Sequence, residues 1–412
     1  MTSDEDCYRA AIGAGVDPGG ASWAELEPAV LRAQRSSLKW TRFEADVLPL
    51  FVAEMDFTIA VEIQDAIVDR IRLSDTGYVD RPGALAPAFA SFAQERWEWR
   101  IDPAFVHLAT DVSVGIVEPL RLRLGDARGR VAITTPVYPS FFEILEELPV
   151  EIVQVPLRET GTGPKPQARL DLVALERAFA SDPGIDALLL CNPHNPHGLL
   201  HTREELETLA RLAAEHNVLV ISDEIHAPLT LRDGVFTPFA PIAARAGALS
   251  ITATSASKGW NLAGLKCSVI VAADERANAL LQQLPPEVAT RASIIGLHAN
   301  IAAFSQGDEW LERAVAQIEA NERLLAQLLQ DRLPLVRYTR PEAGYLAWLD
   351  FREAGLGPDP YRRILTEAKV ALNDGACFGV GGEGHARLNL ACSPDTIVQA
   401  VDRIAAILPR AR

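Results

Sequence analysis

Lysine is scarce in this chain of 412 residues. Only Lys39, Lys165, Lys258, Lys266 and Lys369 are present, against thirty-four arginines. An arginine can pair with an anion, but its guanidinium cannot form a Schiff base. A lysine that such a chain keeps in an apolar neighbourhood therefore calls for a reason. Lys258 has that neighbourhood, because it follows the strand-like run 249–254 in a small, hydroxyl-rich turn.

Cysteine is also rare, and positive charge is in deficit. The five cysteines show no CxxC pair and no metal-site spacing, so we expect no metal site. Cys191 and Cys267 lie in apolar runs that are typical of buried, reduced thiols. The formal net charge of −16 argues against nucleic acid or an anionic membrane surface as the main partner.

Long apolar runs are missing as well. No run approaches the length of about eighteen apolar residues that crosses a membrane, so we expect no membrane association. The first residues are acidic and carry no apolar signal segment, which favours a cytoplasmic protein. Hydrophobic residues make up 48% of the chain and charged residues 23%, which is typical of a globular protein with a large core and a second, smaller one.

Strand-like and helix-like segments alternate through the middle of the chain. Strands are predicted at 106–110, 130–135, 151–155, 185–191, 217–222, 249–254 and 267–272, and helices at 61–73, 85–99, 116–124, 140–148, 171–180, 202–216, 238–247 and 274–284. The strands are nearly continuous runs of Val, Ile, Leu and Ala, which is typical of a sheet covered on both faces. We therefore predict an α/β fold in which residues 60–295 form a large domain with a mixed, mostly parallel sheet.

The C-terminal part changes character. Helices are predicted at 294–304, 307–332, 358–367 and 394–408, and strands at 345–350, 370–372 and 385–390. We predict a smaller α+β domain made of residues 296–412 together with 1–59, the latter with a helix at 23–34 and an extended apolar run at 47–57. The glycine-rich segment 375–382 is predicted to be a loop and no phosphate fingerprint, because no strand-to-helix frame surrounds it.

Polar side chains follow the ends of successive predicted strands. They are Tyr138, Asn195, Asp223 and Lys258, and the turn 111–115 after another strand opens a helix whose free N–H groups suit an anion. The carboxyl ends of parallel strands meet at one edge of a sheet, so we expect these groups in one crevice. An imine-forming lysine, a carboxylate for a ring nitrogen, an amide for a ring oxygen and a stacking aromatic make up a binding set for pyridoxal phosphate.

Each of these residues also has a structural explanation. Lys258 alone reads equally as a surface lysine at a strand end, and Asp223 as a helix cap. Arg387 lies in an apolar strand-like run, where a buried arginine needs an anion, either a structural carboxylate or that of a substrate. The tip 53–56 of the first apolar run is either a strand entry or the border of a ligand site. The order of the set on successive strands favours the functional interpretation.

Seven motifs between residues 37 and 404 form a recognisable pattern. They are Lys39-Trp40 with 52–57, then 135–139, 192–196, 222–226, 255–258 with 261–266, 345–350 and 387–389. The pattern resembles the fold-type I pyridoxal-phosphate enzymes of the class I/II aminotransferase superfamily. Met55-Asp-Phe57 and Asp223-Glu-Ile-His226 resemble the cystathionine β-lyase-like C–S lyase branch of that superfamily.

The resemblance implies roles around the cofactor ring. Lys258 would form the Schiff base with pyridoxal phosphate and move the Cα proton of the substrate. Asp223 would pair with the protonated ring nitrogen, and Tyr138 would stack on the ring. Asn195 and His226 would contact the ring oxygen.

The resemblance also implies contacts with phosphate, substrate and partner. The predicted phosphate-binding residues are Ser113, Val114, Ser255, Ser257 and Lys266, joined by Tyr78 of a second subunit. Arg387, with Asn195 and Glu54, would bind a small amino-acid substrate. The family forms homodimers with active sites at the interface, so a homodimer is expected here.

The implied reaction is β-elimination from a cysteine S-conjugate to thiol, pyruvate and ammonia. Transamination, a specialised reaction such as oxidative decarboxylation of an S-substituted cysteine, and a non-enzymatic regulatory or scaffold role remain as alternatives. The chain departs from the family pattern at His197, His201, 58–60 and Gly344, all expected near the substrate. Substrate and reaction outcome are therefore left open by the sequence.

Overall fold

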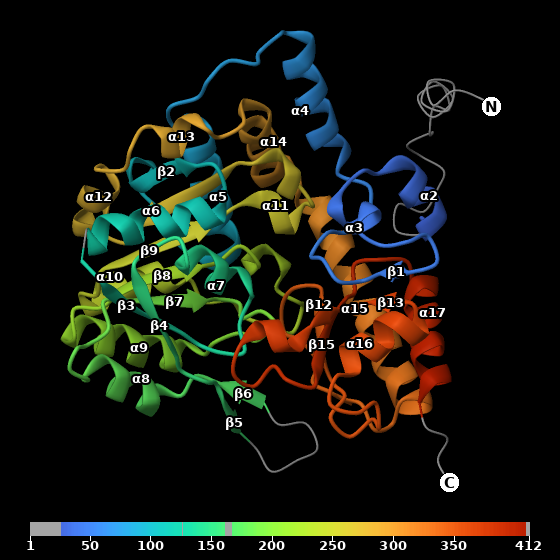
Figure 1. The fold of residues 1–412 in the computed structure, drawn as a ribbon. Coiled ribbons are helices and arrows are strands. Elements are labelled where there is room, and N and C mark those ends of the chain that lie inside the picture. The colour runs from blue at the N-terminus through green and yellow to red at the C-terminus, as the bar shows by residue number, and fades with distance from the viewer. Residues whose placement is uncertain (1–25, 126, 161–166, 409–412) are drawn as a thin grey trace.

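A computed structural model describes residues 26–125, 127–160 and 167–408 (Figure 1). Lys165 and the first residues of the helix predicted at 23–34 lie outside the described residues. Within them, that helix is α2 (Pro28–Gln34), and α3 (Leu38–Thr41) follows it directly. None of the helices in the described part of the chain is long and apolar enough to span a membrane.

A seven-stranded sheet forms the centre of the larger part. Its strands are β2 (Val106–Ala109), β3 (Gly129–Ile133), β4 (Val150–Gln154), β7 (Ala187–Cys191), β8 (Leu219–Asp223), β9 (Ser250–Thr254) and β10 (Ser268–Ala272). The strand order is β2-β10-β9-β8-β7-β3-β4, parallel from β9 to β4, with β10 antiparallel to both of its neighbours. The predicted mixed, mostly parallel sheet is thereby confirmed.

Helices cover both faces of this sheet. They are α5 (Leu85–Trp97), α6 (Val112–Leu124), α7 (Ser140–Leu145), α8 (Leu172–Phe179), α9 (Arg203–Glu215), α10 (Phe239–Ala246) and α12 (Glu275–Leu281). Successive side chains of a strand point to opposite faces, so Leu189 packs in the core beneath α6 while Leu188 and Leu190 pack in the core beneath α8, α9 and α10. This two-sided burial is why the strands are apolar without alternation.

A second, four-stranded antiparallel sheet lies in the C-terminal part. Its order is β11 (Arg337–Tyr338), β12 (Leu346–Asp350), β15 (His385–Asn389) and β14 (Asn373–Asp374). The long helix α15 (Asp308–Arg332) and the last helix α17 (Pro394–Ile407) pack against each other in this part (Figure 1). The helix predicted at 358–367 begins as α16 (Pro360–Arg363) and continues as the π-helical turn η4 (Ile364–Ala368).

Several further elements lie outside the two sheets and the helices named so far. They are α4 (Val61–Arg72), α11 (Ala256–Gly259), α13 (Glu287–Thr290), α14 (Ile294–Gln306), the pair β1 (Leu48–Pro49) and β13 (Val370–Ala371), and the hairpin β5 (Arg158–Thr160) and β6 (Gln167–Arg169), which the sequence did not predict. All seven strands of the large sheet fall within 60–295, and those of the small antiparallel sheet within 296–412. The domain boundaries themselves stay a prediction.

Two segments next to the site differ from the prediction. Only Leu48–Pro49 of the extended run 47–57 is a strand, and side chains bond much of the backbone at 52–55, where Lys39, Asn261 and Asn389 are the partners. Helix α6 begins at Val112 instead of 116, because the carboxylate of Asp111 caps it by accepting a hydrogen bond from the Val114 N–H at 3.0 Å.

Candidate active site

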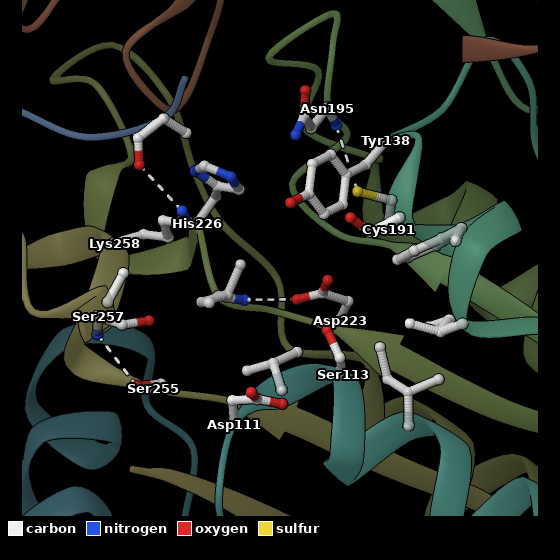
Figure 2. Close-up of a pocket in the computed structure, with 18 of the residues that line it drawn as sticks. Asp111, Ser113, Tyr138, Cys191, Asn195, Asp223, His226, Ser255, Ser257 and Lys258 are labelled. Atoms are coloured by element: carbon white, nitrogen blue, oxygen red, sulfur yellow. Dashed lines mark hydrogen bonds between the residues drawn. The ribbon is translucent and has the colours of Figure 1, made fainter. Parts of the chain in front are cut away.

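Lys258 lies in the short helix α11, which directly follows strand β9. Ser255 follows the last residue of the strand and caps the short helix α11 by accepting a hydrogen bond from the Ser257 N–H at 3.1 Å. The Lys258 Nζ donates to the carbonyl of Ala53 at 3.0 Å (Figure 2). Burial, with the positive charge of Arg387, lowers the pKa of Lys258 to about 8. A substantial fraction of such an amine is neutral near neutral pH, as a nucleophile or base requires.

Asp223 ends the neighbouring strand β8 and reaches the same cavity (Figure 2). Its Oδ1 accepts a hydrogen bond from the Ile225 N–H at 3.1 Å, and among the described residues it forms no ion pair. Burial raises the pKa of Asp223 to about 6. A buried carboxylate without a cation is the complement of a positively charged ring nitrogen.

An aromatic ring, an amide and an imidazole surround the middle of the cavity. The Tyr138 N–H donates to the Asn195 carbonyl at 3.1 Å, which ties the ends of two strands together. The Asn195 N–H in turn donates to the Cys191 sulfur at 3.3 Å. Burial lowers the pKa of His226 to about 3, so its imidazole is neutral, and its Nδ1 has no partner in the part of the chain that the structure describes.

Nine of the thirteen predicted site residues line one cavity of about 160 Å³ (Figure 2). They are Ser113, Tyr138, Asn195, Asp223, His226, Ser255, Ser257, Lys258 and Lys266. The expected crevice at the strand ends is therefore present, and the roles of these residues stay a prediction. Val114, Arg387, Glu54 and Tyr78 do not line it.

The hydroxyl-rich end of the cavity lies at the N-terminus of α6 (Figure 2). Ser113 and Ser257 reach it from opposite sides, whereas the Ser255 hydroxyl donates to the Cys267 carbonyl at 2.7 Å. The Val114 N–H is already bonded to Asp111. Lys266 also bonds to Asp111, with Nζ and Oδ2 2.8 Å apart.

Arg387 lies behind Asn195 and is 2% exposed. It donates from Nη1 to Asn195 Oδ1 at 2.9 Å and from Nη2 to the Phe51 carbonyl at 3.3 Å, while its guanidinium lies over the Phe378 ring. Its Nε has no partner, and no carboxylate of the described residues lies within ion-pair distance. The alternative of a structural salt bridge thus finds no support, and burial lowers the pKa of Arg387 to about 10.

Glu54 and Tyr78 lie outside the cavity. The Glu54 carboxylate accepts a hydrogen bond from the Ser37 hydroxyl at 2.8 Å and lines a neighbouring groove. Its negative charge acts to raise the pKa of Lys258 and so opposes part of the lowering caused by burial. Tyr78 is 95% exposed in the single chain and reaches no predicted site residue, as expected for a residue that serves a second subunit.

Sequence reasoning missed Asp111 and left Ala53 open, because the tip 53–56 was considered either a strand entry or the border of a ligand site. Asp111, which bonds to Lys266, was seen only as part of a turn, although a carboxylate before a helix is a recognisable cap signal. Ala53, whose carbonyl accepts hydrogen bonds from Lys258 and the Tyr345 hydroxyl at 3.0 Å each, carries no side-chain signal at all. A backbone acceptor becomes visible only in the folded chain.

A buried ion pair holds the Ala53 loop in place. Lys39 is fully buried, and its Nζ lies 2.5 Å from Asp56 Oδ1 and 3.1 Å from the Glu54 carbonyl. Asn389 binds the Val52 and Glu54 carbonyls at 2.8 and 2.7 Å. The loop therefore presents the Ala53 carbonyl to Lys258 in a fixed position.

Comparison with known proteins identifies the family of the chain. The family model of aminotransferase class I and II matches residues 88–404. The chain is 40% identical over 390 residues to a Mycobacterium leprae protein assigned to the cystathionine β-lyases, covering 90% of this chain and 94% of the relative. It is 34% identical over 376 residues to the cystathionine β-lyase of Corynebacterium glutamicum, covering 91% and 97%.

A solved structure matches as well. It is a crystal structure from Corynebacterium diphtheriae assigned as a PLP-dependent β-cystathionase, with a TM-score of 0.84 and 34% identity, covering 93% of this chain and 98% of the other. The predicted family and fold class are thereby confirmed. The chain belongs to the class I and II aminotransferase family, in the branch that contains its cystathionine β-lyase relatives.

Proposed function

We propose that this protein is a pyridoxal-phosphate-dependent carbon–sulfur lyase that cleaves a cysteine S-conjugate to thiol, pyruvate and ammonia. The observation that carries the proposal is that Lys258 and Asp223 line one cavity, that Arg387 lies directly behind its Asn195, and that none of these three charged groups contacts a countercharge among the described residues. Burying such groups is costly unless a ligand pairs them. The names of the relatives support the lyase reaction.

The cavity fits pyridoxal phosphate in the chemistry of its lining. Lys258 would hold the aldehyde carbon, and the unpaired carboxylate of Asp223 would hold the ring nitrogen. Tyr138 would cover a ring face, and the unpartnered His226 Nδ1 suits the ring oxygen. The phosphate would be held by Ser113, Ser257 and Lys266. When bound, pyridoxal phosphate supplies an electron-withdrawing ring that stabilises negative charge at the substrate Cα.

Arg387 would bind the substrate carboxylate. Its Nε is unpartnered and buried, and a guanidinium matches a carboxylate with two parallel hydrogen bonds. Asn195 would orient the guanidinium, because the Oδ1 of Asn195 accepts a hydrogen bond from Arg387 Nη1. Such a clamp would fix the direction of the Cα–H bond relative to the ring, and Glu54 would border the substrate from the adjacent groove.

Lys258 would carry the proton during the reaction. With a pKa of about 8, its Nζ is able to take the Cα proton and then give it to the departing sulfur. The Ala53 carbonyl holds that Nζ in place by a hydrogen bond. Loss of the thiol and addition of water then give pyruvate and ammonia.

A product assay tests the reaction type. The holoenzyme is incubated with several cysteine S-conjugates without added keto acid, and thiol, pyruvate, ammonia, carbon dioxide and aldehyde are measured. We expect equal amounts of thiol, pyruvate and ammonia and no carbon dioxide. Turnover only with added keto acid would instead identify an aminotransferase. Carbon dioxide and aldehyde would identify a decarboxylating enzyme, and no turnover a scaffold role.

We also propose a homodimer with its active sites at the interface. Helix α4 exposes Val61, Val68 and Ile71, which are 51%, 41% and 56% exposed, and Leu73 and Tyr78 follow at 66% and 95%. Exposed apolar side chains clustered on one helix are typical of an interface. Sedimentation should show a dimer, and a monomer with full activity would refute this arrangement.

The cytoplasm is the proposed location. The cysteines at 191, 267 and 392 are buried free thiols, and Cys377 is an exposed one, which suits a reducing compartment. Cell fractionation tests this, and recovery of the active protein outside the cytoplasm would refute it.

A further inference from the structure

The carboxylate of Asp111 lies at the end of the cavity where a phosphate would bind (Figure 2). Its Oδ1 accepts from the Val114 N–H at 3.0 Å, and its Oδ2 accepts from Lys266 Nζ at 2.8 Å. Both donors belong to the predicted phosphate-binding set. Asp111 therefore already uses two of the groups that an incoming phosphate needs.

The charge at this end of the cavity is balanced before any anion enters. Lys258 and Lys266 are the only cationic side chains among the described residues that line the cavity, and Lys258 serves its other end. The charge of Asp111 cancels that of Lys266. The remaining attraction for a phosphate comes from the Ser113 and Ser257 hydroxyls and from the Val112 and Ser113 N–H groups, which begin α6 and have no partner within the helix.

We infer that Asp111 limits the affinity of this protein for the phosphate group of its cofactor, by competing for Lys266 and by repelling the anion. This inference rests on the proposed function, because it takes pyridoxal phosphate as the ligand. The carboxylate is not required as a helix cap, since an asparagine caps equally well. An acidic side chain at this position thus weakens the hold on the cofactor and makes the protein exchange it readily.

The test compares pyridoxal phosphate with pyridoxal, which lacks the phosphate. The full-length protein, freed of cofactor, is titrated with each compound, and the visible absorption gives the two dissociation constants. Asp111→Asn keeps the cap and removes the charge. We expect it to tighten binding of pyridoxal phosphate roughly five- to fiftyfold and to leave that of pyridoxal unchanged. The gain should shrink as salt is added, because the interaction is electrostatic.

Asp274→Asn is the matched control. Asp274 caps α12 through the Ala277 N–H at 2.9 Å and pairs with Arg276 at 2.9 Å, so it combines a helix cap and an ion pair as Asp111 does but lies outside the cavity. This variant should change neither dissociation constant.

Three results would overturn the inference about Asp111. They are unchanged binding of pyridoxal phosphate by Asp111→Asn, weaker binding, or an equal change for pyridoxal. Weaker binding would make Asp111 a residue that positions Lys266. If the unaltered protein bound pyridoxal phosphate in no measurable amount, the proposed function would fail together with the inference, and that result is distinct from the other three.

Discussion

The two ends of the cavity treat charge in opposite ways. At the end that would hold the cofactor ring (the ring end), Lys258 and Asp223 line the cavity and Arg387 lies behind it. None of the three contacts a countercharge among the described residues, and burial shifts the pKa of each. At the phosphate end, the side chains of Lys266 and Asp111 are 57% and 30% exposed and form an ion pair with each other. Unpaired buried charges are expensive and call for a ligand, whereas an exposed pair costs little. We therefore expect large effects from variants at the first end and small ones at the second.

Replacement of the lysine at the ring end should have the largest effect. Lys258→Ala removes the amine that holds the cofactor and moves the proton, so we expect turnover to fall at least about a thousandfold. The visible absorption of the bound cofactor should vanish with it. Lys369→Ala is the control, since Lys369 is half exposed and pairs with Asp46 at 3.5 Å. Comparable loss in both variants would contradict the assignment.

The arginine behind the cavity should come next. Arg387→Lys keeps the charge but loses the two-pronged geometry, so we expect kcat/KM to fall roughly ten- to a thousandfold. The absorption spectrum and Tm should barely change. Arg352→Lys is the control, because Arg352 pairs with Asp350, and this variant should leave kcat/KM nearly unaltered. Joint loss of stability and cofactor in Arg387→Lys, with normal kinetics of the folded fraction, would assign Arg387 to the scaffold.

Replacing the aspartate at the ring end should change the free energy of unfolding in a pH-dependent way. Its pKa rises from 3.8 to about 6 on folding, so the folded state penalises the charged form. Below pH 3.8 the carboxyl is protonated in both the folded and the unfolded state, and no penalty arises. Above about pH 6 it is ionised in both states, and the full penalty applies. Asp223→Asn should therefore stabilise the cofactor-free protein by about 3 kcal/mol near pH 8 and by almost nothing near pH 3. Denaturant unfolding at the two pH values measures this, and a pH-independent difference would contradict it.

The exposed pair should matter least for stability. Lys266→Gln removes one partner of a pair that solvent screens, so we expect the free energy of unfolding of the cofactor-free protein to change by less than about 1 kcal/mol. The same unfolding experiment checks it. A loss as large as the gain from Asp223→Asn would erase the contrast between the two ends.

The residues at the ring end of the cavity were easier to predict from the sequence than the residues around them. Apolar strands precede Asp223, Asn195 and Lys258, and the sequence of these strands predicts that they are buried. Parallel strands bring their carboxyl ends to the same edge of the sheet, independently of the loops between them. The central sheet was predictable for the same reason.

Contacts made by loops were not predictable. The loop after β14 places Phe378 beneath Arg387, and Gly379, with a φ of +84°, leaves no room for a side chain beside Thr135 and Phe142. The contacts of Gly379 with Thr135 and Phe142 join residues more than two hundred positions apart, and none of these contacts leaves a local pattern. The Ala53 carbonyl and the Lys39–Asp56 pair belong to the same class, since neither has a periodicity or turn signal.

The covalent role of Lys258 is the central claim, and the scarcity of lysine makes it directly measurable. The holoenzyme is reduced with borohydride, digested, and mapped for the peptide that carries the cofactor. We predict that the label lies on Lys258 alone, because it lines the cavity and its pKa is lowered to about 8. A label on Lys266, on the buried Lys39 or on any other lysine would contradict the account.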